Sequence, residues 1–169
     1  LPNSLVRSGR FDRKIKIDCP TDRDANEIIN YYLSNKKISE TVNIEDLSKM
    51  ISYSSCAELE TILNEAAINA AFERKESIGM NDLVKSVLRM QYDSLDNYTK
   101  ATAKDLKKTA LHEAGHLVVS EVLEPCSVGM ASLRSTGRNS KGGFIHLCKE
   151  LSRRPYQILI SLAGKAAVE

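Results

Sequence analysis

Apolar residues recur every three or four positions over residues 21–92, and this spacing predicts four short amphipathic helices. The third helix has the strongest start, because Glu58 follows Ser55 at the three-residue spacing of a capping box. The residues expected to cap the four helices are Thr21, Asn43, Ser55 and Asn81. Short connections join the helices, so the stretch is expected to fold as a small helical bundle.

Two neighbouring stretches differ from this bundle. Ile15 and Ile17 alternate with charged residues over 14–18, which is the pattern of a half-buried strand. Residues 93–104 are polar and show no periodicity. We therefore predict that they link the bundle to a second unit.

The second unit is predicted to be a helix, a hairpin and another helix. The first helix covers about 106–123. Strand candidates over 126–133 and 144–148 flank a turn rich in Gly, Ser and Asn, which indicates a hairpin. Ser152 and Pro155 then introduce the last helix. Its expected core positions are Ile158, Leu159, Leu162, Ala163 and Ala166.

Composition adds limits on the class of protein. The 169 residues are 42% hydrophobic and 27% charged, which is typical of a globular chain. With 24 basic and 22 acidic residues, the net charge of +2 argues against nucleic-acid binding driven by bulk charge. The four widely spaced cysteines are expected to be free thiols in a reducing compartment. The chain lacks an initiator Met, and we interpret it as a fragment.

The motif HEAGH, residues 112–116, carries the most specific chemistry. On a helix, His112 and His116 project from one face and can bind one zinc ion together. Glu113 points to the side of that pair, where it can take a proton from a water acidified by the metal. The spacing therefore predicts a peptidase-type zinc site.

The alternative interpretation is two hydrogen-bonded histidines without a metal. The helix is apolar on nearly every side beyond His116, so we expect it to be buried, and buried imidazoles need partners. We favour zinc. A catalytic zinc takes three protein ligands, but a lone strand histidine such as His146 is more often structural. Glu124 and Glu150 are no better candidates for the third ligand.

The segment LVRSGRFDR places Arg7, Arg10 and Arg13 three residues apart. On spacing alone, a solvated basic turn is the favoured interpretation. The functional interpretation is a contact to phosphate, because guanidinium groups can neutralise charge on a transferring phosphoryl group.

Three segments together resemble the FtsH family of ATP-dependent zinc metalloproteases. LPNSLVRSGRFDRKIKIDCP, residues 1–20, is similar to the end of the second region of homology of AAA+ ATPases. SSCAELETILNEAAINAA, residues 54–71, resembles the AAA+ lid helix, and TALHEAGH, residues 109–116, resembles the zinc motif. The order and separation of the three segments make the resemblance specific.

The resemblance implies a mainly α fold, in which an AAA+ C-terminal four-helix lid precedes the helix–hairpin–helix start of a zinc metallopeptidase domain. Residues 1–19 would end the AAA+ large subdomain and hold the arginine-finger segment, and 20–92 would form the lid. The linker would be 93–104, and 105–169 would be the N-terminal part of the peptidase domain.

The resemblance also assigns roles to residues. Arg10 and Arg13 match arginines that reach the ATP of a neighbouring subunit, with Arg10 as the better match for the finger. His112 and His116 match zinc ligands, and Glu113 matches the catalytic glutamate. The third ligand of the family, an aspartate, would lie beyond residue 169, and the nucleotide-binding Walker motifs would lie upstream of residue 1.

One lid turn departs from the family pattern. Tyr53 and Cys56 stand where glycines are usual, whereas Ala57 is kept. In the family this turn lies near the nucleotide base, so Cys56 and Ala57 are the lid positions expected to contact nucleotide. The bulkier residues indicate a divergent member with altered ATP binding.

The implied function is that of an ATP-dependent zinc metalloendopeptidase that unfolds and degrades proteins, with Zn²⁺ and ATP with Mg²⁺ as cofactors of the full-length protein. The fragment itself is expected to be inactive. The implied partners are the other subunits of a homohexameric ring and unfolded or membrane protein substrates, not nucleic acid. The implied location is the cytoplasmic face, with any membrane anchor upstream. The alternatives are an AAA+ remodelling or chaperone-like ATPase with a disused peptidase domain, and a purely structural helical module.

Overall fold

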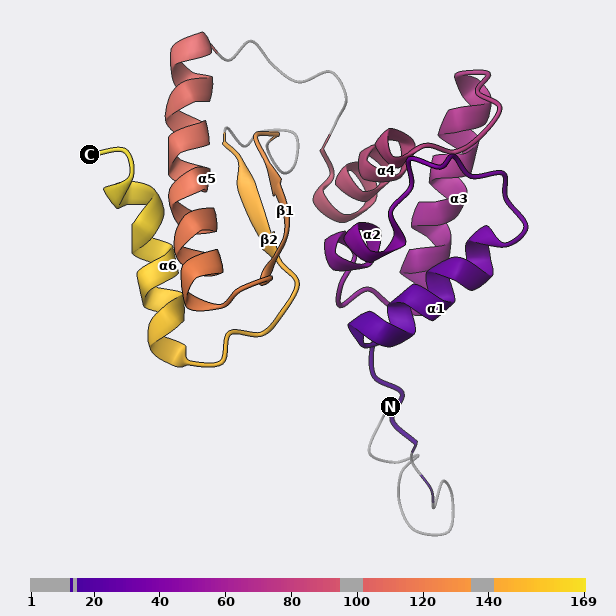
Figure 1. Cartoon of the computed structure of the whole chain (residues 1–169), viewed down its shortest axis with the longest axis horizontal. Helices are drawn as coiled ribbons and strands as arrows, with labels where there is room; N and C mark the ends of the chain where they lie inside the picture. Colours follow the sequence, from indigo (N-terminus) through magenta and orange to yellow (C-terminus); the bar gives the residue numbers. More distant parts are fainter. Residues whose placement is uncertain (1–12, 14, 95–101, 135–141) are drawn as a thin grey trace, which may run out of the picture.

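The structure is a computed structural model that describes residues 13, 15–94, 102–134 and 142–169 (Figure 1). Its first part is a bundle of four helices, which confirms the expected helical class. The helices are α1 (Asp22–Leu33), α2 (Ile44–Met50), α3 (Cys56–Phe72) and α4 (Met80–Tyr92). We call this bundle, from Thr21 to Tyr92, the lid-like bundle.

The helix starts follow the predicted caps in three cases. The side chains of Thr21, Asn43 and Ser55 all accept hydrogen bonds from first-turn backbone N–H groups. The prediction that Asn81 caps the fourth helix is wrong, because α4 already begins at Met80 with Gly79 as the cap. The Asp82 carboxylate accepts from the Gly79 N–H at 3.0 Å and so fixes the earlier start.

The bundle encloses one apolar core. The core side chains recur every three or four positions along the helices, as predicted, and most are fully removed from solvent. They include Ile29, Leu33, Leu47, Ile51, Leu59, Ile62, Leu63, Ala66, Leu83 and Val87. This core makes the bundle the best-packed part of the described chain.

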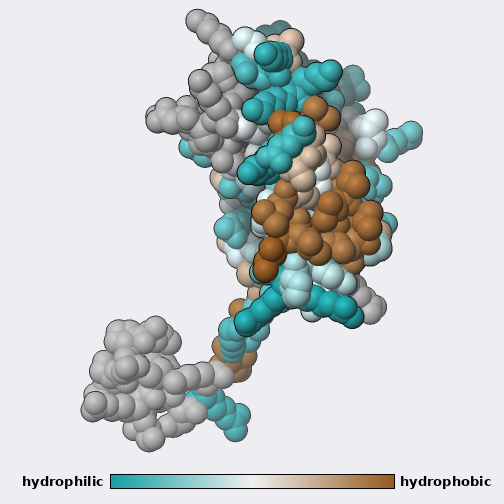
Figure 2. Space-filling view, turned by 90° about the vertical axis from the view of Figure 1, so that its left-hand side faces the viewer, coloured by the Kyte–Doolittle hydropathy of each residue, from teal (hydrophilic) through white to brown (hydrophobic). Residues whose placement is uncertain are grey.

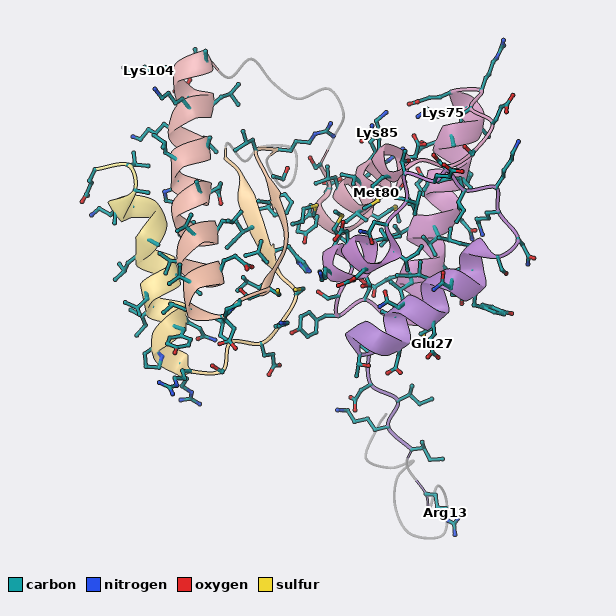
Figure 3. All side chains as sticks on the ribbon, viewed as in Figure 1. Arg13, Glu27, Lys75, Met80, Lys85 and Lys104 are labelled. Atoms are coloured by element: carbon teal, nitrogen blue, oxygen red, sulfur yellow. The ribbon has the colours of Figure 1, made fainter. Side chains whose placement is uncertain are left out.

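Ion pairs fix the turn between α3 and α4. Lys75 pairs with Glu73 at 2.6 Å and with the buried Asp82 at 2.5 Å, and Lys85 pairs with Glu73 at 2.9 Å. Lys75 lies in the turn after α3 and Lys85 lies on α4, and both pair with Glu73 (the lysines are labelled in Figure 3). Hydrogen bonds from these two ammonium groups lower the pKa of Glu73 to about 2.

The second part is the predicted helix, hairpin and helix. Its elements are α5 (Ala103–Leu123), β1 (Val128–Ser132), β2 (Phe144–Leu147) and α6 (Arg154–Ala166). The strands pair antiparallel, with Met130 opposite His146 and Ser132 opposite Phe144. Helix α5 begins three residues earlier than predicted, because Thr102 and Asp105 form a capping box. The two helices run in opposite directions side by side (Figure 1).

The hairpin packs directly against the lid-like bundle. Met130 of β1 is buried in the bundle's own core. The ring of Phe144 stacks on Tyr92, the last residue of α4, with 4.1 Å between the centroids. At Gly129 the backbones come so close that an added Cβ would lie 2.2 Å from the Lys49 carbonyl oxygen. The bundle and the hairpin therefore pack against each other, although the predicted linker separates them in the sequence.

The strand predicted over 14–18 is not formed by the described residues 15–18. Ile15 is 86% exposed and Ile17 is 90% exposed. A strand needs a neighbour to satisfy its backbone hydrogen bonds and an apolar surface to cover its side chains. No described element supplies either to this segment.

The prediction that the HEAGH helix is buried on all sides is also wrong. Helix α5 packs against α6 and the hairpin, but Val118 and Val122 on its far side are 56% and 75% exposed. Helix α6 buries Ile160, Ala163 and Gly164, so Ala163 is the one predicted core position of this helix that is buried. Ile158, Leu159 and Leu162 are therefore exposed, and Figure 2 shows the apolar surface on this side of the molecule.

All four cysteines are free thiols, as predicted. Cys148 is buried, whereas Cys19, Cys56 and Cys126 are exposed. Among the described helices, none has both the length and the apolar character needed to cross a membrane.

We expect Gly129→Ala to loosen the contact between the hairpin and the lid-like bundle. Its methyl group would collide with the Lys49 carbonyl, and relief of that collision requires the backbones to separate. The expected loss of unfolding free energy is about 1–3 kcal/mol, measured by urea denaturation. Gly79→Ala is the control, because its methyl group meets nothing closer than 3.6 Å. Equal losses in the two variants would contradict the packing argument.

Candidate metal and peptidase site

Helix α5 presents His112 and His116 one turn apart, so both imidazoles project from the same face. Nε2 of His116 lies 3.1 Å from Nε2 of His112. The rings are nearly perpendicular, at 87°, with 4.6 Å between their centroids. The outer nitrogens of the two histidines therefore converge on one point.

Helix α6 fixes the orientation of one of these rings. Nδ1 of His116 lies 2.6 Å from the backbone carbonyl oxygen of Ile160. A carbonyl can only accept, so Nδ1 must carry the hydrogen. In the neutral ring this leaves a lone pair on Nε2, which is the form that binds a metal. This backbone partner could not be predicted from the sequence, because it lies 44 residues away.

Two glycines allow α6 to come this close. A Cβ added to Gly164 would lie 2.3 Å from Nε2 of His116 and 2.7 Å from Cε1 of His112. One added to Gly115 would lie 2.5 Å from the Ala163 carbonyl oxygen. The absence of side chains at both positions therefore leaves the space in which the two histidines meet.

Glu113 faces the hairpin side of α5. A Cβ added to Gly143, just before β2, would lie 2.7 Å from Cγ of Glu113. A cavity of about 540 Å³ is lined by His112 and Glu113 together with Gly143 and Lys165. A smaller apolar cavity of about 180 Å³ lies on the other side of Glu113, against β1. The carboxylate thus borders space that a substrate could enter.

The two histidines fit a shared zinc ion in geometry. A Zn–N bond of about 2.0–2.1 Å with tetrahedral angles places two nitrogen ligands about 3.3 Å apart, close to the 3.1 Å between the Nε2 atoms. The same spacing suits an N–H···N hydrogen bond when His112 carries its proton on Nε2. Within the described residues, no group of three or more His, Cys, Asp or Glu side chains could hold a metal ion.

His146 lies in the contact between the hairpin and the lid-like bundle. Its Nε2 lies 2.9 Å from the Ser52 hydroxyl, and its Nδ1 lies 2.8 Å from the Tyr92 hydroxyl. Both ring nitrogens are therefore committed to protein hydroxyl groups. These two bonds agree with the structural role expected for this histidine.

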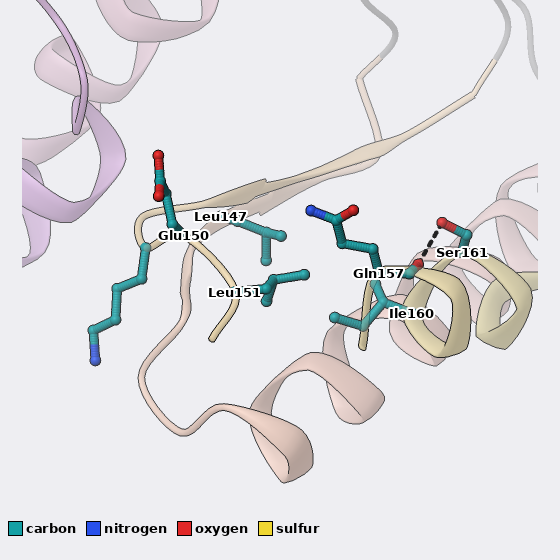
Figure 4. A pocket seen from close by; sticks show the side chains of 7 residues that line it. Leu147, Glu150, Leu151, Gln157, Ile160 and Ser161 are labelled. Atoms are coloured by element: carbon teal, nitrogen blue, oxygen red, sulfur yellow. Dashed lines mark hydrogen bonds between the residues drawn. The ribbon is translucent and has the colours of Figure 1, made fainter. Parts of the chain in front are cut away.

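The acidic alternatives for the third ligand are also engaged elsewhere or exposed. Glu124 accepts a 2.7 Å hydrogen bond from Ser152 and follows the end of α5. Glu150 borders a separate cavity of about 500 Å³ between the end of β2 and α6 (Figure 4). None of the HEAGH residues lines that cavity.

Among the described residues, those assigned to nucleotide lie outside this site. Arg10 is outside the described residues, and Arg13 is exposed on the N-terminal segment, away from the helices (Figure 3). Cys56 and Ala57 are exposed in the first turn of α3. Tyr53 has a φ of 66°, the left-handed conformation that favours glycine. The turn thus keeps the backbone shape that a glycine would adopt.

We predict that acidification destabilises the fold through His146. Burial lowers the pKa of this imidazole below its ordinary value of 6.5. As the pH falls below about 6.5, His146 is protonated in the unfolded state before it is protonated in the folded state. The contribution of the neutral imidazole to the unfolding free energy is therefore fully present above that pH and is lost below it. The measurement is unfolding free energy at several pH values between 7 and 5.

The control for this prediction is His146→Gln, which keeps a donor and an acceptor but cannot titrate. Every other side chain is the same in the two proteins, so a difference between their slopes comes from position 146. The dependence on pH should be shallower in the variant, and an unchanged slope would show that His146 is not its source.

Comparison with known proteins places the whole chain in one family. No protein-family model matches the chain. Over the full length of the chain, it is 34% identical to the ATP-dependent zinc metalloprotease FtsH of Thermus thermophilus, and the match covers 28% of that protein. It is also 34% identical over its full length to FtsH of Thermotoga maritima, and that match covers 29% of the relative.

A third relative is the ATP-dependent zinc metalloprotease FtsH 2 of Sphaerobacter thermophilus, 32% identical over 154 residues, which are 90% of this chain and 23% of that protein. The chain thus spans about a quarter of the length of the curated relatives that it matches. Over the segment that it covers, the chain belongs to the FtsH family of ATP-dependent zinc metalloproteases.

Proposed function

We propose that the chain is the part of an ATP-dependent zinc metalloendopeptidase that holds the helical lid, two zinc ligands and the catalytic glutamate. The observation that carries this proposal is the convergence of His112 and His116, with 3.1 Å between their Nε2 atoms, beside the Glu113 carboxylate. The names of the FtsH relatives support the same chemistry.

Each residue of the motif has a distinct task in this proposal. His112 and His116 supply neutral nitrogen donors, and the Ile160 carbonyl keeps the second ring in the donor tautomer. Zinc, when bound, supplies Lewis acidity to water and to a peptide carbonyl. Glu113 accepts the proton of the attacking water and gives it to the leaving amine. The hairpin beside Gly143 forms one wall of the substrate space.

The ATP-dependent half of the proposal concerns other residues. Arg10 and Arg13 would neutralise charge on the ATP of a neighbouring subunit, and Cys56 and Ala57 would lie near nucleotide bound with Mg²⁺. The assembly would be a homohexameric ring that acts on unfolded or membrane proteins at the cytoplasmic face. We infer these roles from the family and from the matching sequence positions.

We expect the chain to bind zinc through the histidine pair, and Gly164→Ala to weaken that binding by about tenfold or more. The added methyl group would occupy the space of the two imidazoles. Isothermal titration with Zn²⁺ measures the affinity. Ser161→Ala, on the exposed side of the same helix, is the matched control. If His112→Ala binds zinc as tightly as the unaltered chain, the ion is held elsewhere and the proposed site is wrong.

We expect Glu113→Gln to lower the rate of casein degradation about 10²–10⁴-fold while zinc content stays the same. Gln keeps the size of the side chain but cannot accept the proton. The assay uses a protein of the relatives' length that contains this segment, because the described residues hold only two of the ligands. Glu27→Gln, an exposed change on α1, is the control.

The same assay separates the competing function. A protein that hydrolyses ATP but leaves casein intact, with or without Glu113, would be a remodelling ATPase whose peptidase domain is disused. Unchanged casein degradation in the Glu113→Gln protein would instead show that another group moves the proton.

A further inference from the structure

The hairpin lies between the lid-like bundle and helix α5 and contacts both (Figure 1). At the bundle, Met130 enters the apolar core and Phe144 stacks on Tyr92. At the helix, Gly143 lies against Glu113. A single pair of strands therefore spans the distance between two parts that the sequence separates.

The side chain of His146 holds strand β2 against the bundle. Ser52 follows α2 and Tyr92 ends α4, so the two hydroxyl groups that bind the imidazole come from different parts of the bundle. The Tyr92 ring also meets the imidazole edge to face, at 82°. Bonds at both nitrogens fix the position and the rotation of the ring, and with them the position of β2.

The stretch from His146 to Gly143 has little freedom to absorb movement. Three of its residues pair with β1, as Phe144 faces Ser132, Ile145 faces Ala131 and His146 faces Met130. At about 3.3 Å per residue, the stretch covers roughly 10 Å. Next to Phe144, which stacks on Tyr92, a Cβ on Gly143 would lie 2.5 Å from the Ser132 carbonyl and 2.7 Å from Cγ of Glu113. A shift of β2 relative to the bundle must therefore change the contact with Glu113.

We propose that the β1–β2 hairpin couples the position of Glu113 to the lid-like bundle, and that His146 is a positioning residue where β2 contacts the bundle. The catalytic consequence rests on the proposed function of Glu113, whereas the mechanical coupling does not. A bundle that moves with nucleotide would, through this hairpin, change the space around Glu113.

Nuclear magnetic resonance of the 169-residue chain tests the coupling directly. The unaltered chain should give a cross-relaxation signal between the Gly143 Hα and Glu113 Hγ protons, and the two parts should tumble as one body. In His146→Ala the signal should weaken because β2 loses both hydrogen bonds to the bundle, while Met130 and Phe144 still hold the two parts together. His146→Gln should retain both properties, because its amide can replace both hydrogen bonds.

Two further variants separate positioning from general stability. Ile29→Val weakens the bundle core away from the hairpin and should leave the signal and the joint tumbling intact. Tyr92→Phe keeps the stacking on Phe144 but removes one hydroxyl bond, so the signal should weaken even where His146→Ala does not fold. A full signal with joint tumbling in both His146→Ala and Tyr92→Phe would overturn the coupling.

These measurements need neither zinc nor substrate, so they are independent of the proposed peptidase activity. In the longer protein, His146→Ala should lower ATP-dependent casein degradation while ATP hydrolysis continues. An inactive unaltered protein would refute the proposed function and leave the coupling to be judged on the magnetic resonance results. Unchanged degradation in an active protein that carries His146→Ala would overturn the catalytic consequence.

Discussion

The close approach of α5 and α6 determines most of the candidate site. Gly115 and Gly164 remove the side chains that would otherwise hold the helices apart. Because the helices are so close, the Ile160 carbonyl can reach Nδ1 of His116. That one hydrogen bond selects the tautomer of the ring, and the tautomer decides what Nε2 can bind. Local packing thus fixes the chemical state of a side chain whose sequence motif specifies only its position.

The helices were largely predictable from sequence, because their signals are local. Thr21, Asn43 and Ser55 cap the helices that they were expected to cap, since each bond joins residues two or three positions apart. The cap of α4 was predicted wrongly as Asn81, because the actual cap, Gly79, has no side chain that a sequence pattern could recognise. The Gly79 N–H donates to the Asp82 carboxylate inside the helix. The hairpin was also found, from its alternation and its Gly-rich turn.

Burial and partners were less predictable, because they depend on contacts between distant parts. The pattern of α6 favoured an apolar face on Ile158 and Leu162, but the glycine at 164 draws the opposite side toward α5. The pairing of His112 and His116 could be predicted from their spacing, whereas the Ile160 carbonyl could not. The small residues at Gly115, Ala163 and Gly164 were the sign in the sequence that two elements approach closely there. Similarly, the polar composition of residues 93–104 predicted a linker between two parts. It could not reveal that Met130, from the second part, is buried in the core of the first.

The exposed valines and leucines on α5 and α6 have a consequence for the behaviour of the segment in solution. Side chains such as Val122 and Leu162 remain in contact with water, and their burial against any apolar surface would be favourable. The net charge of +2 provides little electrostatic repulsion between copies. Sulfate and other salts that strengthen apolar burial should therefore promote self-association, so colloidal solubility will limit the usable concentration before unfolding does.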